Sequence, residues 1–370
     1  MRAFVLLVIF VSFFDLFTQL PIISPYAKSL GASPFLIGLT VGMYSFANTI
    51  ANIASGILTD RNGAKRILLI GLLATALSLF SYVFATHPFS LLVVRFIHGL
   101  TAGLIVPSAF TLLANIGTRE QKGKNAAISG AFVGSAAILG PAFSGIVANR
   151  VGELVVFSSV ATLMLFLGLF SYLFLRDINI ETETKQAEKL IFNDRLYKAF
   201  AGAFFLMFAQ GALAYLLPLK TIELGGTTAT SGLLLSTFGI IAVLLFALPT
   251  NRVFDQLNPL NGLAFGMIAI GLSLIAIGSM TTLAPMFLLM GGYGVGFAFL
   301  FPSLHSLLID ATSEKNRGKA YGYFYAFFSI GVIAGSSITG WISKTINSGF
   351  ILTGVIVISA SIAIRFIHKK

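Results

Sequence analysis

The sequence contains no cysteine, and charged residues make up only 10% of its 370 positions. Disulfide bonds and thiolate metal ligands are therefore excluded. With 56% hydrophobic residues and so few charges, the chain cannot cover its outside with polar groups, as a water-soluble protein of this length must. These absences indicate a protein that lies in a lipid bilayer.

Several catalytic patterns are also missing. The sequence has no glycine-rich phosphate-binding loop, so we expect no nucleotide to drive the protein. It has no cluster of metal ligands and no HExxH pattern, and no arrangement of serine, histidine and aspartate argues for a hydrolase. We therefore expect a protein that is not an enzyme and has no resident cofactor.

Long apolar runs recur along the chain, and each has about the 20 residues that a helix needs to cross a bilayer. Strands are disfavoured, because a spanning sheet needs a closed barrel and alternating hydrophobicity. The sequence predicts an all-α integral membrane protein with twelve spans. They lie at residues 3–24, 34–58, 67–86, 89–116, 125–148, 154–175, 199–219, 231–250, 260–280, 284–309, 320–343 and 348–366.

The net charge of +11 comes from a one-sided distribution of basic residues. Of the 24 lysines and arginines, 19 fall on one set of alternating loops and on the two termini. This positive-inside pattern predicts a multi-pass protein of the cell (inner or plasma) membrane with both termini in the cytoplasm. We expect the basic loops to contact anionic lipid headgroups. A nucleic-acid partner is not expected, because no soluble domain carries a basic patch with aromatics.

The sequence repeats itself with an offset of 195 residues, which places Asp255 where Asp60 stands in the first copy. Two homologous halves are expected: an N-terminal six-helix bundle at residues 1–175, a linker at 176–198 and a C-terminal six-helix bundle at 199–370. Paired bundles of this kind are typical of secondary transporters, with the binding site near the bilayer midplane between the repeats. Further matched positions are Gly99 and Gly294, Pro107 and Pro302, Gly140 and Gly335, and Gly145 and Gly340.

The loop GILTDRNGAKR after the second span resembles the signature between helices 2 and 3 of the major facilitator superfamily, although Ala64 stands where a basic residue is common. The resemblance implies a gate in which Asp60 faces the start of helix 11 near residues 318–320. Asp255 would face the start of helix 5 near residues 123–125. The alternative is that Asp60 is an ordinary loop charge. The implied gating residues of this loop are Gly56, Asp60, Arg61, Gly63 and Arg66.

Two ionisable residues lie deep inside predicted spans, Asp15 in the first and Arg95 in the fourth. Charges at such positions are costly and usually functional. Arg95 with Gly99 and Gly103 also resembles a superfamily motif that is tied to proton coupling. We therefore expect Asp15 and Arg95 to couple transport to protons. The alternative for Arg95 is a structural cation bonded to backbone carbonyls. The alternative for Asp15 is a buried polar group that stabilises a helix contact.

In the fifth span, Gly140, Pro141 and Gly145 look like the motif of the antiporter branch of the superfamily. Proline and glycine allow a helix to bend, so we expect a hinge at a seam between the halves. The resemblance implies export. Ala127 and Ala136 stand where the motif has glycine, and a kinked packing helix is the alternative.

Helices 1, 4, 7 and 10 line the substrate cavity in this superfamily. The resemblance therefore implies a set of polar cavity residues, each of which has packing as its alternative role. They are Gln19, His98, Gln210, Tyr215, Tyr293 and His305.

Together these features predict a secondary active transporter that works by alternating access, most like the drug:proton antiporter branch. We expect a monomer that exports small lipophilic or cationic compounds, as multidrug efflux carriers do, with the proton gradient as its energy source. Its partners would be the small-molecule substrate, protons and membrane lipids. The alternatives are a dedicated carrier of a sugar, amino acid or lipid precursor, and a non-transporting receptor or scaffold.

Replacement of Asp60 with asparagine tests the implied gate. The loss of the negative charge removes its attraction to a helix N-terminus, so the outward-open state is expected to become less stable. Cytoplasmic accessibility in a labelling experiment should then rise. Unchanged accessibility would show that Asp60 is an ordinary loop charge.

Overall fold

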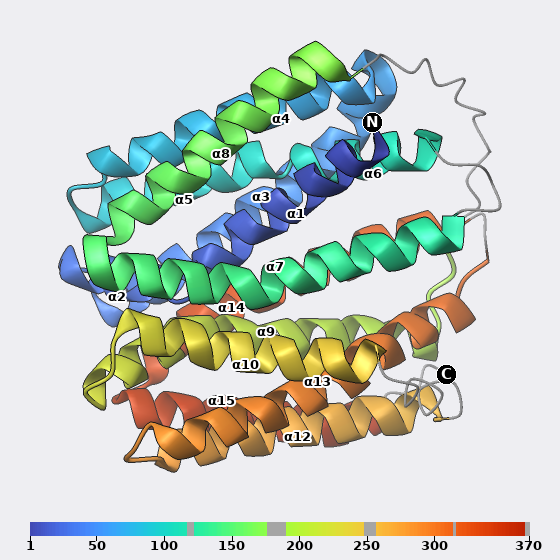
Figure 1. Cartoon of the computed structure of the whole chain (residues 1–370). Coiled ribbons are helices and arrows are strands. Elements are labelled where there is room, and N and C mark those ends of the chain that lie inside the picture. The colour runs from blue at the N-terminus through green and yellow to red at the C-terminus, as the bar shows by residue number, and fades with distance from the viewer. Residues whose placement is uncertain (117–121, 176–189, 248–256, 314–315, 367–370) are drawn as a thin grey trace. The chain divides into compact units, whose positions relative to one another are not determined.

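The computed structural model describes residues 1–116, 122–175, 190–247, 257–313 and 316–366. Within these ranges every regular element is a helix (Figure 1). Eleven helices are long and apolar enough to cross a membrane, or twelve when α1 (Arg2–Thr18) and α2 (Ile23–Ser29), which are bent by 44°, count as one broken span. The predicted all-α, multi-pass membrane fold is confirmed.

The second half repeats the helix order of the first. For example, α4 and α12 begin at Ala64 and Pro259, and α7 and α14 begin at Lys122 and Arg317, each pair 195 residues apart. The first half contains α3 (Pro34–Asn62), α4 (Ala64–Phe80), α5 (Pro88–Ala102), α6 (Ile105–Ile116), α7 (Lys122–Val151) and α8 (Glu153–Phe174). The second half contains α9 (Asp194–Glu223), α10 (Thr228–Ala247), α12 (Pro259–Ser279), α13 (Ala284–Asp310), α14 (Arg317–Ile342) and α15 (Ile346–Arg365).

Helix packing repeats as well. In the first half α1 packs on α7, and α4 packs on α5, α6 and α8. In the second half α9 packs on α14, and α12 packs on α13 and α15. The pseudo-symmetry that the sequence repeat predicts therefore extends to which helices touch.

The chain divides into two compact units, and each unit includes a short segment from the other half of the sequence. Unit 1 comprises residues 1–32, 43–183 and 227–236, and unit 2 comprises the rest. The start of α3 thus belongs to unit 2, where a Cβ at Gly38 would lie 2.1 Å from the carbonyl oxygen of Ser336. The start of α10 belongs to unit 1. The boundaries expected at 175 and 199 stay a prediction.

Two spans of unit 1 are interrupted near a proline. Pro21 has no amide hydrogen, and residues 19–22 form turns between α1 and α2. Pro107 likewise cannot donate to Gly103, and residues 103–104 form the turn between α5 and α6. Each break follows a helix that carries ionisable side chains, so the broken spans position those side chains.

The helix α9 begins earlier than the predicted span. Asn193 caps it, because its side-chain oxygen accepts from the backbone N–H of Leu196 at 3.0 Å. The side chain of Asn193 also donates to the carbonyl of Ala311 at 3.2 Å. Residues 194–198, which were expected in the linker, are therefore helical. Residues 176–189 of that linker lie outside the described ranges.

Glycines spaced by four bring helix backbones together at two places. A Cβ at Gly99 or Gly103 would lie 2.4 or 2.5 Å from backbone oxygens of α3, and a Cβ at Gly331 or Gly335 would lie 2.4 or 2.0 Å from those of α9. Glycine thus permits close backbone contact at these two seams. Gly130 has no such role, because a Cβ there would meet nothing within 4 Å.

Two glycines of α14 give a matched test of this packing. Gly335→Ala forces a methyl group against the carbonyl of Phe208, whereas Gly322→Ala points into open space. We expect Gly335→Ala to destabilise the protein by roughly 1–3 kcal/mol, as overpacked cores do. The midpoint of thermal unfolding in detergent should fall for Gly335→Ala and stay the same or rise for Gly322→Ala, since alanine favours a helix more than glycine does. Equal midpoints would contradict this account of the seam.

Candidate functional site

Unit 1 contains a cluster of polar side chains that is closed to the surroundings. Asp15 and Gln19 come from the end of α1, and Arg95 and His98 come from α5. Asp15 and His98 are fully buried, and Gln19 and Arg95 are 2% and 4% exposed. Because charges this deep are stable only when paired or hydrogen-bonded, the contacts within the cluster determine its properties.

Asp15 accepts hydrogen bonds at both carboxylate oxygens. His98 Nε2 lies 3.0 Å from Oδ2, and Gln19 Nε2 donates to Oδ1 at 3.0 Å. The same Gln19 nitrogen and the hydroxyl of Thr18 bond to the backbone carbonyl of Asp15 at the broken end of α1. The carboxylate is therefore held by its own helix and by α5.

Arg95 joins the cluster through Gln19. Its Nη1 donates to Gln19 Oε1, so this amide bridges the guanidinium and the carboxylate. The guanidinium carbon also lies 5.0 Å from the ring centre of Tyr44, within the range of a cation–π contact.

His98 connects the carboxylate to Tyr82, whose hydroxyl lies 3.1 Å from His98 Nδ1. With Asp15 ionised, His98 Nε2 carries a proton and donates to it. In the neutral ring Nδ1 then accepts from Tyr82, and in the imidazolium it donates to Tyr82. Both protonation states of His98 fit the same geometry, so the chain from Tyr82 to Asp15 persists when a proton is added.

Aromatic rings close the cluster on the Tyr82 side. Tyr82 stacks on Phe157 with ring centres 3.9 Å apart, and Phe157 contacts Tyr26 at 6.0 Å. Tyr44 and Tyr82 both meet the edge of the His98 ring at 5.0 and 5.7 Å. These rings exclude water, which strengthens the electrostatic interactions inside.

The structure brings together four residues that the sequence singled out separately, Asp15, Gln19, Arg95 and His98. The sequence interpretation missed Tyr44 and Tyr82, because it followed charged and amide groups. The available signal was that a buried tyrosine hydroxyl in an apolar span needs a hydrogen-bond partner. The predicted roles in proton coupling and substrate binding stay predictions.

Unit 2 contains a neutral copy of the central contact. Gln210 and Tyr293 lie 195 residues after Asp15 and His98, and the hydroxyl of Tyr293 donates to Gln210 Oε1 at 3.0 Å. The repeat therefore preserves the contact between the two helices while replacing the acid with an amide.

The other two predicted cavity residues lie apart from this pair. Tyr215 is 5% exposed in α9. His305 is half-buried in α13.

The predicted gating loop is described in part. Gly63 has φ +83° and forms the turn between α3 and α4, as expected for a glycine. Arg61 and Arg66 are exposed. Gly56 lies within α3, and a Cβ there would meet nothing within 4 Å among the described residues. The side chain of Asp60 and all of Asp255 lie outside the described part of the chain.

The helix around Pro141 makes a close contact within unit 1, against the start of α10. A Cβ at Gly145 would lie 2.5 Å from the carbonyl oxygen of Thr228, and a Cβ at Gly140 would lie 2.9 Å from the side chain of Phe17. The hydroxyl of Ser236 donates to the carbonyl of Ile138 at 2.7 Å, next to the hydrogen bond that Pro141 cannot make. The contact lies within unit 1, and both the expected seam between the halves and bending at Pro141 stay predictions.

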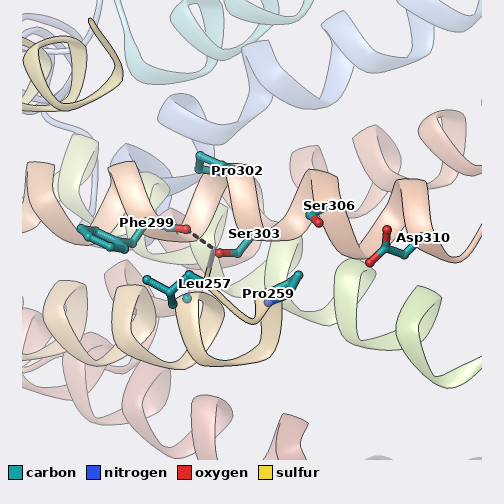
Figure 2. A pocket seen from close by; sticks show the side chains of 8 residues that line it. Leu257, Pro259, Phe299, Pro302, Ser303, Ser306 and Asp310 are labelled. Atoms are coloured by element: carbon teal, nitrogen blue, oxygen red, sulfur yellow. Dashed lines mark hydrogen bonds between the residues drawn. The ribbon is translucent and has the colours of Figure 1, made fainter. Parts of the chain in front are cut away.

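A separate cleft of about 420 Å³ lies in unit 2, where α12 begins and α13 ends (Figure 2). Asp310 is its one charged lining residue and lies 3.7 Å from the exposed Arg195. No group of three or more potential metal ligands occurs among the described residues, so the cleft is not assigned to a metal. Its lining residues are Leu257, Pro259, Gly262, Phe299, Pro302, Ser303, Ser306 and Asp310.

Comparison with known sequences gives a family match over most of the chain. The profile of the Major Facilitator Superfamily matches residues 5–219 and 199–370. An uncharacterised MFS-type transporter of Methanocaldococcus jannaschii is 25% identical over 338 residues, which cover 88% of this chain and 87% of that protein. The quinolone resistance protein NorA of Staphylococcus aureus is 34% identical over 142 residues, which cover 38% of this chain and 36% of NorA.

Solved structures agree with this fold. A bacterial homologue of the human lysosomal transporter Spinster, inward-facing and occupied, has a TM-score of 0.83 at 13% identity and covers 98% of this chain and 95% of its own. A POT family transporter in complex with 5-aminolevulinic acid has a TM-score of 0.82 at 14% identity, with coverage of 98% and 95%. At these identities the likeness concerns the fold alone.

Removal of the Tyr82 hydroxyl tests the hydrogen-bond chain. Tyr82→Phe leaves the stack on Phe157 in place and deprives His98 Nδ1 of its partner, at an expected cost of about 0.5–1.5 kcal/mol in stability. The ¹⁵N NMR signal of His98 Nδ1 should move more than that of Nε2. The sequence has only four histidines, so the signals can be assigned by substitution. In the control Phe157→Leu the stack is lost and the Nδ1 signal should stay. An unmoved Nδ1 signal in Tyr82→Phe would contradict the chain.

Proposed function

Since this chain belongs to the Major Facilitator Superfamily and is a membrane transporter, we propose that it exports small lipophilic or cationic compounds in exchange for protons. The observation that carries the proposal is the closed cluster of Asp15, Gln19, Arg95 and His98. It contains one carboxylate and one guanidinium, both withdrawn from the surroundings.

The charge balance of this cluster supports a proton-binding role. With Asp15 ionised and His98 neutral, the charges of Asp15 and Arg95 cancel. One added proton, on either Asp15 or His98, leaves a net positive charge in a desolvated site. A site with this property releases its proton readily when a second positive charge arrives nearby. Proton and cationic substrate therefore compete, which is the requirement for exchange.

Exchange also requires that each ligand prefers one conformational state, because a ligand with equal affinity for both states shifts nothing. The two breaks in the broken spans of unit 1 lie next to the cluster. A change in protonation alters the hydrogen bonds of Asp15, whose backbone carbonyl accepts from Thr18 and Gln19 at the first break. The cluster is thus well placed to bias the path of these helices.

The direction and substrate class are supported by the partial likeness to NorA, a quinolone resistance protein. That match spans about a third of NorA, so drug efflux by this chain is a proposal and does not follow from the match alone. The positive-inside pattern supports the orientation with both termini in the cytoplasm. The absence of a nucleophile and base motif from the sequence supports transport without catalysis.

Replacement of Asp15 tests the coupling. We expect that purified protein in liposomes with an internal pH-sensitive dye moves protons when a lipophilic cation is added, and that Asp15→Asn abolishes this flux. The reason is that asparagine cannot take up a proton in this pH range. The control Glu223→Gln removes an exposed acid at the end of α9 and should keep the flux.

The outcomes separate the alternatives. Proton flux that survives Asp15→Asn would move the coupling to another group, such as His98. Substrate exchange without any proton movement would indicate a uniporter or an exchanger and would contradict proton coupling. A panel that includes sugars and amino acids distinguishes efflux of lipophilic cations from a dedicated metabolite carrier.

A further inference from the structure

One side of α13 in unit 2 carries a row of rings at every fourth residue. Phe297 and Phe301 are stacked with ring centres 5.5 Å apart and an angle of 11°, and Phe301 lies 4.3 Å from the ring of His305. Residues four apart lie on one face of a helix. The row begins at Phe238 of α10, which meets Phe297 at 5.2 Å.

The row continues onto α14. His305 contacts Tyr321 at 5.8 Å and Phe324 at 5.2 Å, and Tyr321 stacks with Tyr325 at 6.2 Å and 25°. Phe324 is fully buried and contacts His305, Tyr321 and Tyr325, whereas Tyr325 is 49% exposed. We call the rings of Phe297, Phe301, His305, Tyr321 and Tyr325 the aromatic ladder. Its neighbour Phe324 is buried, and its most exposed ring is that of Tyr325.

His305 supplies the only ring nitrogens of the ladder. Its Nδ1 lies 2.9 Å from the carbonyl oxygen of Phe301. A carbonyl only accepts, so Nδ1 carries the proton and the neutral ring has a lone pair on Nε2. Among the described residues no group bonds to Nε2, and this half-buried side chain is not enclosed. The ladder therefore presents a ring-nitrogen acceptor in the middle of the row, apart from the tyrosine hydroxyls at its Tyr321–Tyr325 end.

The ladder is distinct from the polar cleft of Figure 2, which is lined from α13 by Phe299, Ser303 and Asp310. No member of the ladder carries a fixed charge. A guest is thus held by stacking and by the negative faces of the rings, which also tolerate a positive charge. A lipid tail has no flat ring to stack on these faces and no donor for His305 Nε2, so the ladder fits a flat aromatic guest better than a lipid.

We propose that the aromatic ladder binds flat aromatic compounds that carry an N–H or O–H donor, with the donor directed to His305 Nε2. The inference rests on the proposed function and names a substrate class for it. Two acridines of equal charge and similar ring area separate the contributions. 9-Aminoacridine is a flat cation with N–H donors, and 10-methylacridinium is a flat cation with none.

The test is equilibrium binding of each dye to the full chain in nanodiscs, followed by fluorescence anisotropy and without any proton gradient. His305→Phe keeps a ring and removes the acceptor. It should raise the Kd of 9-aminoacridine about tenfold and leave that of 10-methylacridinium unchanged, as expected for one lost hydrogen bond. Tyr325→Leu removes an exposed ring and should weaken both dyes. The control Phe170→Leu removes an exposed ring from the stacked Phe170–Phe174 pair of α8 and should change neither.

Equal weakening of the two dyes in His305→Phe, or no change in either, would overturn the inference. If His305→Phe lowers the unfolding midpoint, His305→Gln serves as the second variant, since its amide oxygen restores an acceptor and should recover 9-aminoacridine binding. Binding needs no gradient, so the two proposals fail separately. Dye discrimination without proton flux would contradict the exchange mechanism only. Proton flux without dye discrimination would contradict only the proposed binding site at the aromatic ladder.

Discussion

The bridge that Gln19 forms between Asp15 and Arg95 is the constraint around which the polar cluster of unit 1 is built. Neither charge is accessible to solvent, and Gln19 links them by a hydrogen bond at each end of its amide. Removal of one partner of a buried charge pair typically costs about 3–5 kcal/mol, because the other charge is left uncompensated. We therefore expect the side-chain contact between α1 and α5 to contribute to the stability of unit 1.

The surrounding structure can be understood as support for that contact. Helix α1 ends at Thr18, three residues before Pro21, and the side chains of Thr18 and Gln19 donate to the backbone carbonyl of Asp15 in its last turn. On α5, Gly99 lets the backbone approach α3 closely enough for Tyr44 to reach Arg95 and His98. The break after α1 and the small residue Gly99 on α5 thus help to set the positions of the charged groups.

Most of the fold followed from the sequence, because apolar runs and a fixed repeat are strong local signals. The spans agree with the structure to within a few residues, and the largest differences lie at the bend after Thr18 and at the start of α9. Asp15 and Arg95 stood out because charge is rare in such a chain. Tyr82 and the aromatic ladder did not, because 36 phenylalanines and 10 tyrosines give no local sign of which rings meet. Such contacts depend on side-chain directions across helices, which spacing alone does not fix.

The contact between Gln210 and Tyr293 has a consequence for energetics across the membrane. Matched positions of the two halves form a side-chain contact, and of these two contacts only that of the first half contains an acid. Among the described residues Asp15 is the one buried carboxylate, and under the proposed mechanism it loads one proton per cycle. Exchange of a proton for a monovalent cation moves no net charge. Transport of such a substrate would then follow the pH difference between the two sides and would be indifferent to the membrane voltage.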